Sequence, residues 1–206
     1  MKKTLIIIGV IISLIVLIHS VGYIPPRDLE TKAAELKAYC KKHNYNTEVG
    51  ILVDYGRYSG RERFYLWDFR SNQVIVSCMC GQGYGGAKSF GGNKFSNEIG
   101  SNCSSLGHYK LGIKRKMYSS DRMAYELDGL DETNSNARVR AIILHQVALP
   151  AHVICPLPIP NGLRLFGKRI FSAVSAGCIT IPFSKFDECS EVIETTDKPV
   201  IMWVYN

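Results

Sequence analysis

Three short apolar runs with turn-forming residues between them constrain the fold of this chain most strongly. The runs cover residues 48–55, 62–69 and 73–80, and they are rich in the β-branched and aromatic residues that strands favour. Glycines between residues 56 and 60 separate the first two runs, and Arg-Ser-Asn at residues 70–72 separates the second from the third. Because short turns join neighbouring strands that run in opposite directions, the pattern predicts an antiparallel meander.

Four more strands and two helices are expected in the rest of the chain. The further strand candidates are residues 107–113, 140–147, 178–181 and 200–205. A helix is predicted over residues 29–42 because its apolar residues recur at the spacing of one helical face, and a second is predicted over residues 184–194. With 18 glycines and 10% aromatic residues, the composition fits strands joined by tight turns better than a helical bundle. The expected fold class is mainly β with short flanking helices.

The N-terminus carries the pattern of an export segment. Two lysines precede a 15-residue apolar run from Thr4 to Ile18, as in a signal peptide. Extended to Ile24, the segment has 21 residues, enough to span a bilayer without being cleaved. Residues 1–24 are therefore expected to be either a signal peptide or a membrane anchor. The remaining chain is expected to be exported, to the periplasm or cell envelope, with inner-membrane anchoring in the uncleaved form.

The charge of the chain is only mildly basic. Lys and Arg number 25 against 18 Asp and Glu, a net charge of +7, and 23 against 18, or +5, remain without the two N-terminal lysines. This excess is weaker than the basic patch of a dedicated nucleic-acid binder, so no nucleic-acid partner is expected. It suits work near an anionic polymer or membrane surface, and equally an ordinary basic surface.

Seven cysteines bear on the redox state of an exported chain. They are Cys40, Cys78, Cys80, Cys103, Cys155, Cys178 and Cys189. An odd number in an oxidising compartment leaves at least one free thiol, and if that thiol is Cys178 the other six can form up to three disulfides of open connectivity. The Cys-x-Cys pair lacks the Cys-x₂-Cys spacing of common zinc sites, so buried thiols or disulfides are predicted and no metal site is assigned.

Two segments offer groups for nucleophilic catalysis. His145 closes an apolar strand, and Gly177 directly precedes Cys178. A glycine before a cysteine lets the backbone turn tightly, so that neighbouring N–H groups can converge as an oxyanion hole. A cysteine nucleophile also needs a base, usually imidazole. On spacing alone, a buried structural cysteine and a histidine at the core edge remain the simpler explanation, and His108 and His152 are alternative bases.

Several ordered blocks resemble the YkuD-type L,D-transpeptidases, and more closely their murein L,D-transpeptidase catalytic-domain-like branch. The blocks that carry the resemblance are Gly81-x-Gly83, Phe95-Ser96-Asn97, Gly100-Ser101, Ser104-Ser105-Leu106-Gly107, Leu127-Asp128-Gly129-Leu130, Asn134-x-Asn136-Ala137-Arg138-x-Arg140-Ala141-Ile142 running into His145, and Ser175-Ala176-Gly177-Cys178 running to Pro182. The likeness extends from about residue 48 to residue 205.

The resemblance implies a YkuD-like β-sandwich or barrel over residues 48–206, preceded by an N-terminal helix and linker over residues 25–47. It implies an exported cysteine L,D-transpeptidase, a transferase acting on peptidoglycan stem peptides without a metal or organic cofactor. Cys178 would attack the peptide carbonyl between the diamino acid and D-alanine, with His145 as general base. Backbone N–H groups of Gly177 and Cys178 would hold the oxyanion, and the amine of a neighbouring stem peptide would resolve the thioester.

Six residues are candidates for binding the substrate. They are Ser175, Ala176, Tyr84, Asn97, Ser105 and Arg169. Arg169 is a candidate because Thr180 stands where the wider family carries an arginine that can hold a carboxylate, a task for which a hydroxyl is a poor substitute. Each candidate also has a plainer explanation: short polar residues in a glycine-rich loop make local turn bonds, a tyrosine packs, and a surface arginine is solvated.

Two departures from the family pattern leave other functions open. Gln146 follows the histidine where glycine is common, and Thr180 replaces an arginine. A hydrolase of the same fold would use water as acceptor, as a carboxypeptidase or amidase, and a catalytically silent module would only bind the wall.

Two further arginines, Arg138 and Arg140, lie two apart, so in a strand they would face one way. A structural ion pair with Asp128 or Asp131 is expected. Residues 146–177 contain several prolines and are predicted to hold an inserted loop over the cleft.

Overall fold

The computed structural model describes residues 4, 6–14, 28–57, 61–86, 93–118, 120–148 and 175–206, together with the backbone of residues 164–165 and 168–169. The elements in chain order are α2 (Leu29–Lys42), β1 (Val49–Asp54), β2 (Glu62–Asp68), β3 (Gln73–Met79), β4 (Gly107–Lys116), β5 (Met123–Gly129), the 3₁₀ helix η1 (Glu132–Asn134), β6 (Ile143–Val147), β7 (Arg164–Leu165), β8 (Lys168–Arg169), β9 (Ile179–Pro182), α3 (Phe183–Ile193) and β10 (Ile201–Tyr205).

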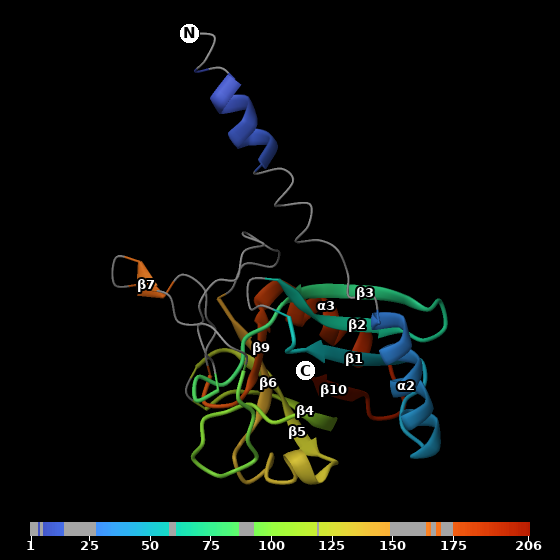
Figure 1. Ribbon diagram of the computed structural model, residues 1–206. Helices are drawn as coiled ribbons and strands as arrows, with labels where there is room; N and C mark the ends of the chain where they lie inside the picture. The colour runs from blue at the N-terminus through green and yellow to red at the C-terminus, as the bar shows by residue number, and fades with distance from the viewer. Residues whose placement is uncertain are drawn as a thin grey trace.

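Eight of these strands form one sheet in the order β3-β2-β1-β10-β4-β5-β6-β9. The first three strands run antiparallel to one another, so the predicted meander is confirmed. Two pairs are parallel, β1 with β10 and β6 with β9. In Figure 1 the last pair lies at one end of the sheet, where the chain returns from a distant part of the sequence.

The two edge strands of the sheet meet and make it an almost closed barrel. Directly after β3, Gly81 forms an antiparallel bridge with Thr180 of β9, and its N–H donates to the Thr180 carbonyl over 2.8 Å. A closed sheet leaves few unpaired backbone groups at its edges. The predicted mainly β fold with a barrel-like sheet is therefore confirmed, and the closure lies two residues from Cys178.

Two apolar clusters cover the two faces of the sheet. The inner cluster joins alternate residues of the strands to one side of α3, including Phe186, Cys189 and Ile193. The outer cluster joins α2 to β1, β2 and β10 through Leu36 and Cys40, which are fully buried. Figure 1 shows α2 beside β1 and β10. Both helices were predicted within one residue of their ends, and α2 buries the face that its spacing indicated.

The expectation for residues 107–147 is wrong at two points. β5 was not predicted, although it buries Ala124, Tyr125 and Leu127. Residues 136–141 form successive turns, in which the Arg140 N–H donates to the Asn136 carbonyl over 2.9 Å, and β6 begins only at Ile143. Arg138 and Arg140 therefore do not share a strand face.

The six described cysteines are all free, which corrects the expectation of disulfides among them. Cys178 is partly exposed and the other five are buried; these are Cys40, Cys78, Cys80, Cys103 and Cys189. Cys40 lies in the outer cluster, whereas Cys78, Cys80 and Cys189 lie in the inner one. The buried thiols thus act as small apolar side chains. Cys155 and His152 lie outside the described residues.

The N-terminal segment is described only in part. Residues 6–14 are helical, and their large apolar side chains are exposed and belong to neither cluster. Within the described part of the chain, no helix is both long and apolar enough to cross a bilayer. The signal-or-anchor prediction for residues 1–24 and the division at residue 48 stay predictions. The predicted inserted loop also falls largely outside the described residues.

Candidate active site

The segment that carries Cys178 is fixed by hydrogen bonds on both sides. Ser175 pairs with the chain at residues 82–84: its N–H donates to the Gln82 carbonyl over 3.1 Å, and the Tyr84 N–H donates to its carbonyl over 2.9 Å. The Ser175 hydroxyl donates to the Cys178 carbonyl over 2.6 Å and accepts the Gly177 N–H over 3.1 Å. One short side chain therefore closes the turn that presents the thiol.

Gly177 is required by the shape of this turn. Its φ is +123°, a conformation that side-chain-bearing residues rarely adopt. A Cβ here would lie 2.8 Å from Ile142 Cδ1 and 2.9 Å from the Cys103 carbonyl oxygen. The Gly177 carbonyl also accepts the Ser104 hydroxyl over 3.1 Å. The glycine thus lets the cysteine segment lie directly on β6 and on the residues around Cys103.

The parallel register of β6 and β9 places His145 close to the segment that carries Cys178. His145 lies opposite Thr180, and Cys178 lies two residues before Thr180. With strands about 4.8 Å apart and a rise of about 3.3 Å per residue, the Cα atoms of His145 and Cys178 are about 8 Å apart on the diagonal. Cys178 lies one residue before β9 begins, so the register brings the two residues close together across the β6–β9 pair.

Within the described residues the two side chains are held by backbone groups and share no hydrogen bond. The Cys178 thiol donates to the Ala141 carbonyl over 3.7 Å. His145 Nδ1 lies 2.9 Å from the Gln146 carbonyl oxygen, so this nitrogen carries the proton. Nε2 is then the basic nitrogen of the ring. A proton acceptor is therefore available on β6, the strand that lies beside the cysteine segment.

Burial sets the protonation state of both groups. Burial raises the pKa of the Cys178 thiol, and the Ile143 N–H and the Arg140 guanidinium lower that pKa in part. Burial also lowers the pKa of His145, and the positive charge of Arg122 lowers it further. At neutral pH both groups are uncharged. The arrangement suits proton transfer from the thiol to imidazole during attack, in preference to a thiolate formed beforehand.

Tyr84 and Ala176 are the exposed candidates beside the thiol. The Tyr84 side chain is 53% exposed, and its backbone is bonded to Ser175. Ala176 is exposed between Ser175 and Gly177. Both lie on or beside the segment that presents Cys178, and their contact with a substrate stays a prediction.

Asn97 and Ser105 use their polar groups inside the protein. Asn97 ties its loop to the next one: its amide donates to the Glu132 carbonyl over 2.9 Å, and its side-chain oxygen accepts the Asn136 N–H over 3.1 Å. The Ser105 hydroxyl is buried and lies 2.8 Å from the Tyr109 hydroxyl. For these two, the contacts favour the alternative of local structural bonds.

The two positions that depart from the family pattern lie on opposite faces of the sheet. The Gln146 side chain accepts the Met123 N–H over 2.8 Å and donates to Asp187 over 2.8 Å, so it links β5 to α3. Thr180 is buried beside His145 in the register of β6 and β9. Gln146 is thus a structural residue that links two elements of the fold. The Arg169 side chain lies outside the described residues.

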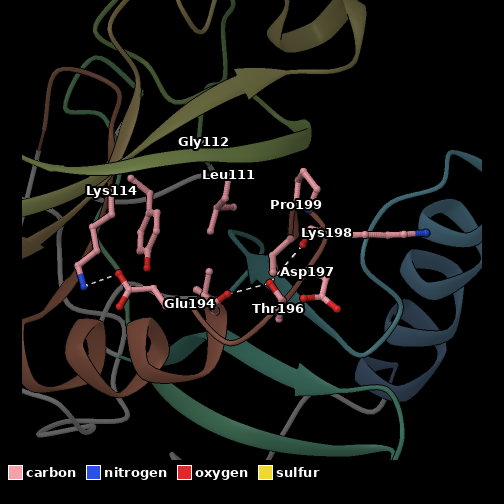
Figure 2. Close-up of a pocket in the computed structure, with 11 residues that line it drawn as sticks. Leu111, Gly112, Lys114, Glu194, Thr196, Asp197, Lys198 and Pro199 are labelled. Carbon is pink, nitrogen blue, oxygen red and sulfur yellow. Dashed lines mark hydrogen bonds and ion pairs between the residues drawn. The ribbon is translucent and has the colours of Figure 1, made fainter.

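A separate hollow lies away from these groups. It has a volume of about 450 Å³ and lies between β4, β5, the end of α3 and the segment before β10. Figure 2 shows Lys114 and Glu194 paired at one side of it, and Lys198 directed away from it. Among the described residues that line it there is no candidate for catalysis. The candidate active site is therefore the surface around Cys178.

The family of the chain is decided by a model that matches most of its length. The family described as L,D-transpeptidase catalytic domain matches residues 23–205. The chain belongs to this family of L,D-transpeptidases. The match covers α2 as well as the whole eight-stranded sheet. The resemblance seen in the sequence is thereby confirmed, and membership of this family makes the enzyme class that of the transpeptidases.

Among solved structures, the chain is similar to the L,D-transpeptidase from Xylanimonas cellulosilytica. The two share 9% sequence identity, the TM-score is 0.38, and the match covers 82% of this chain and 68% of the other. No curated protein matches the sequence of this L,D-transpeptidase.

Proposed function

We propose that this L,D-transpeptidase is exported and joins peptidoglycan stem peptides through a thioester on Cys178, with His145 as general base. The observation that carries the proposal is the register of β6 and β9, which sets His145 opposite Thr180, two residues after Cys178. The neutral state of both groups supports it, since a neutral imidazole can accept the proton that the thiol loses on attack.

The reaction proceeds in two acyl transfers. The Cys178 sulfur attacks the carbonyl between the diamino acid and D-alanine while His145 Nε2 takes the thiol proton. The imidazolium returns this proton to the departing nitrogen, and D-alanine leaves with a thioester in its place. The amine of a second stem peptide then attacks the thioester and loses a proton to His145. The new amide is a cross-link, and the thiol is restored by the same proton.

The oxyanion is held by the backbone at the cysteine. The Cys178 N–H lowers the pKa of its own thiol, and we assign it as one donor to the developing oxyanion. The Gly177 N–H donates to the Ser175 hydroxyl in the unbound protein. It joins the oxyanion hole only by exchanging that hydroxyl for the substrate oxygen, which makes Ser175 a residue that positions the turn.

Export places the enzyme beside its polymer. The helical residues 6–14 follow two lysines and expose an apolar surface, with Ile7 59% and Val10 60% exposed. Such a segment is suited to a signal peptide or an anchor, and it belongs to neither apolar cluster of the described residues. We infer that residues 1–24 direct the chain to the periplasm or cell envelope.

The proposal is tested with defined muropeptides. The purified protein is incubated with disaccharide tetrapeptide, and the products are separated and weighed by mass spectrometry. A dimer that has lost one D-alanine is expected, and the Cys178→Ala variant is expected to lose at least about 10³-fold of this activity, as for other nucleophiles of covalent catalysis. Trimmed monomers without dimer would establish the hydrolase instead. A Cys178→Ala protein with full turnover would falsify the nucleophile assignment.

A further inference from the structure

Arg140 has an unusual set of partners for an arginine. Its guanidinium donates to the Ser96 carbonyl over 2.9 Å, to the Ser105 hydroxyl over 3.2 Å and to the Ser101 hydroxyl over 3.4 Å, and it also donates to the Cys103 carbonyl. All four partners are neutral. Within the described residues, no carboxylate forms an ion pair with this side chain. The Arg140 guanidinium is therefore partly buried among neutral partners.

Arg138, two residues earlier, shows the contrast. It is about half exposed and binds Asp128 through Nε over 2.7 Å, and it also pairs with Glu126. Its charge is neutralised at the surface of β5. The turns at residues 136–141 send Arg138 outward and Arg140 inward, so the two arginines carry out different tasks.

The Arg140 guanidinium lies directly behind the cysteine turn. Its Nη2 atom is 3.0 Å from the point that a Cβ on Gly177 would occupy. The Cys103 carbonyl, which Arg140 binds, lies 2.9 Å from the same point. The guanidinium thus binds the chain at residues 96–105 and lies against the turn that presents Cys178, beside the Ile142 side chain.

We propose that Arg140 is the positioning residue of the cysteine site: it fixes the 96–105 segment beneath the Gly177–Cys178 turn, and its unpaired charge stabilises the negative charge that develops at Cys178 and at the substrate oxygen. The catalytic consequence of this inference rests on the proposed function, whereas the effect of Arg140 on the Cys178 thiol is independent of any substrate. A fixed positive charge in a partly buried site acts over several ångströms because little water screens it.

The electrostatics of the thiol agree with this geometry. Burial raises the pKa of the Cys178 thiol, and three groups lower it: the Ile143 N–H, the Arg140 guanidinium and the N–H of Cys178 itself. His145 is the titratable neighbour across the strands, and Arg122 acts on His145. Arg140 is accordingly the one charged group that favours the thiolate directly among the described residues.

The test follows the ionisation of Cys178 without substrate. Full-length wild-type protein, R140M, R140K and R138M are alkylated with iodoacetamide across a range of pH, and the modified Cys178 peptide is quantified by mass spectrometry. At a fixed pH below the midpoint of the curve of alkylation rate against pH, R140M is expected to react about tenfold more slowly than wild type. This corresponds to a rise of about one pH unit in the pKa of the Cys178 thiol. R138M is expected to match wild type.

R140K separates the two parts of the proposal. It keeps the charge but has fewer donors, so its alkylation profile is expected to stay close to wild type while its kcat in the muropeptide assay falls. If R140M fails to fold by circular dichroism, the R140K profile alone decides. The inference would be overturned if R140M had the same alkylation profile against pH as wild type. It would also be overturned if the midpoint of the R140K profile were displaced by about one pH unit or more. Absence of transpeptidation by wild type would instead count against the proposed function.

Discussion

At Gly177 the backbone has a φ of +123°, and the space that a side chain would need is filled by Ile142, Cys103 and Arg140. Backbone and packing therefore impose the same requirement at the residue before the nucleophile. The glycine is needed twice over: it reaches a conformation that other residues avoid, and it lets the Arg140 charge approach the turn. A substitution at Gly177 is therefore expected to affect both the stability of the protein and the cysteine site.

Gly177→Ala is expected to lower the free energy of unfolding by about 2–4 kcal/mol, since backbone strain and overpacking add. The measurement is urea unfolding, followed by the rate of Cys178 alkylation. Gly100→Ala is the matched control because Gly100 also has a positive φ, +79°, but nothing within 4 Å of its Cβ position. It is expected to lose about 1 kcal/mol from backbone strain alone. Equal losses in the two variants would show that packing against Gly177 contributes nothing.

Arg138 and Arg140 show what the sequence could and could not predict at this scale. Both arginines were found by their spacing, and an ion pair with Asp128 was expected and is made by Arg138. The strand interpretation of residues 140–142 is wrong because successive turns form there instead. The direction of Arg140 depends on the carbonyls of Ser96 and Cys103, which are distant in sequence. No local pattern could indicate contacts of this kind.

At the scale of elements, the local pattern was sufficient wherever one face of an element is apolar. β1, β2 and β3 follow from their apolar runs and turns, and α2 follows from the spacing of its buried residues. β5 was missed because Glu126 and Asp128 interrupt its apolar residues, and these charges are paired with Arg138 on the sheet surface. The parallel pairing of β6 with β9 joins segments about 35 residues apart, so only the fold reveals it.

The β6–β9 pair also determines the pH dependence of acylation. Burial and Arg122 lower the pKa of His145, so the base is neutral above that lowered pKa. Acylation of Cys178 by tetrapeptide, followed by intact mass, is expected to rise through a midpoint below about 6.5 and then to level off. Arg122→Gln removes a charge that opposes protonation, so its midpoint is expected to move upward toward 6.5. A midpoint that stays in place in this variant contradicts the electrostatic account.

The lowered pKa of His145 also determines how the free energy of unfolding changes with pH. Because the pKa of His145 is lowered in the folded state, the unfolded chain binds more protons between that value and about 6.5. The contribution of His145 to stability is therefore complete above about 6.5 and declines as the pH falls through this interval. His145→Gln is expected to flatten this part of the curve of unfolding free energy against pH.

At the scale of the whole molecule, closure of the barrel connects the sheet to the site. β3 ends at Met79, and the next residues reach β9 through the Gly81–Thr180 bridge. Arg63 lies beneath this junction and is only 1% exposed. Its Nε donates to the Cys80 carbonyl over 2.7 Å, and one of its other nitrogens donates to the Gln82 side chain over 2.9 Å. One buried guanidinium thus holds both residues that flank Gly81.

Arg63→Met is expected to destabilise the protein by about 2–4 kcal/mol, because the Cys80 carbonyl and the Gln82 oxygen lose buried donors at once. Gln82 also accepts the Ser175 N–H through its backbone, so the disturbance reaches the cysteine turn and Cys178 alkylation is expected to change as well. Arg70→Met is the control, since Arg70 is 70% exposed and its pair with Glu48 spans 3.6 Å. It is expected to cost less than about 1 kcal/mol. Urea unfolding measures both, and an Arg63→Met protein as stable as Arg70→Met would mean that closure does not depend on this side chain.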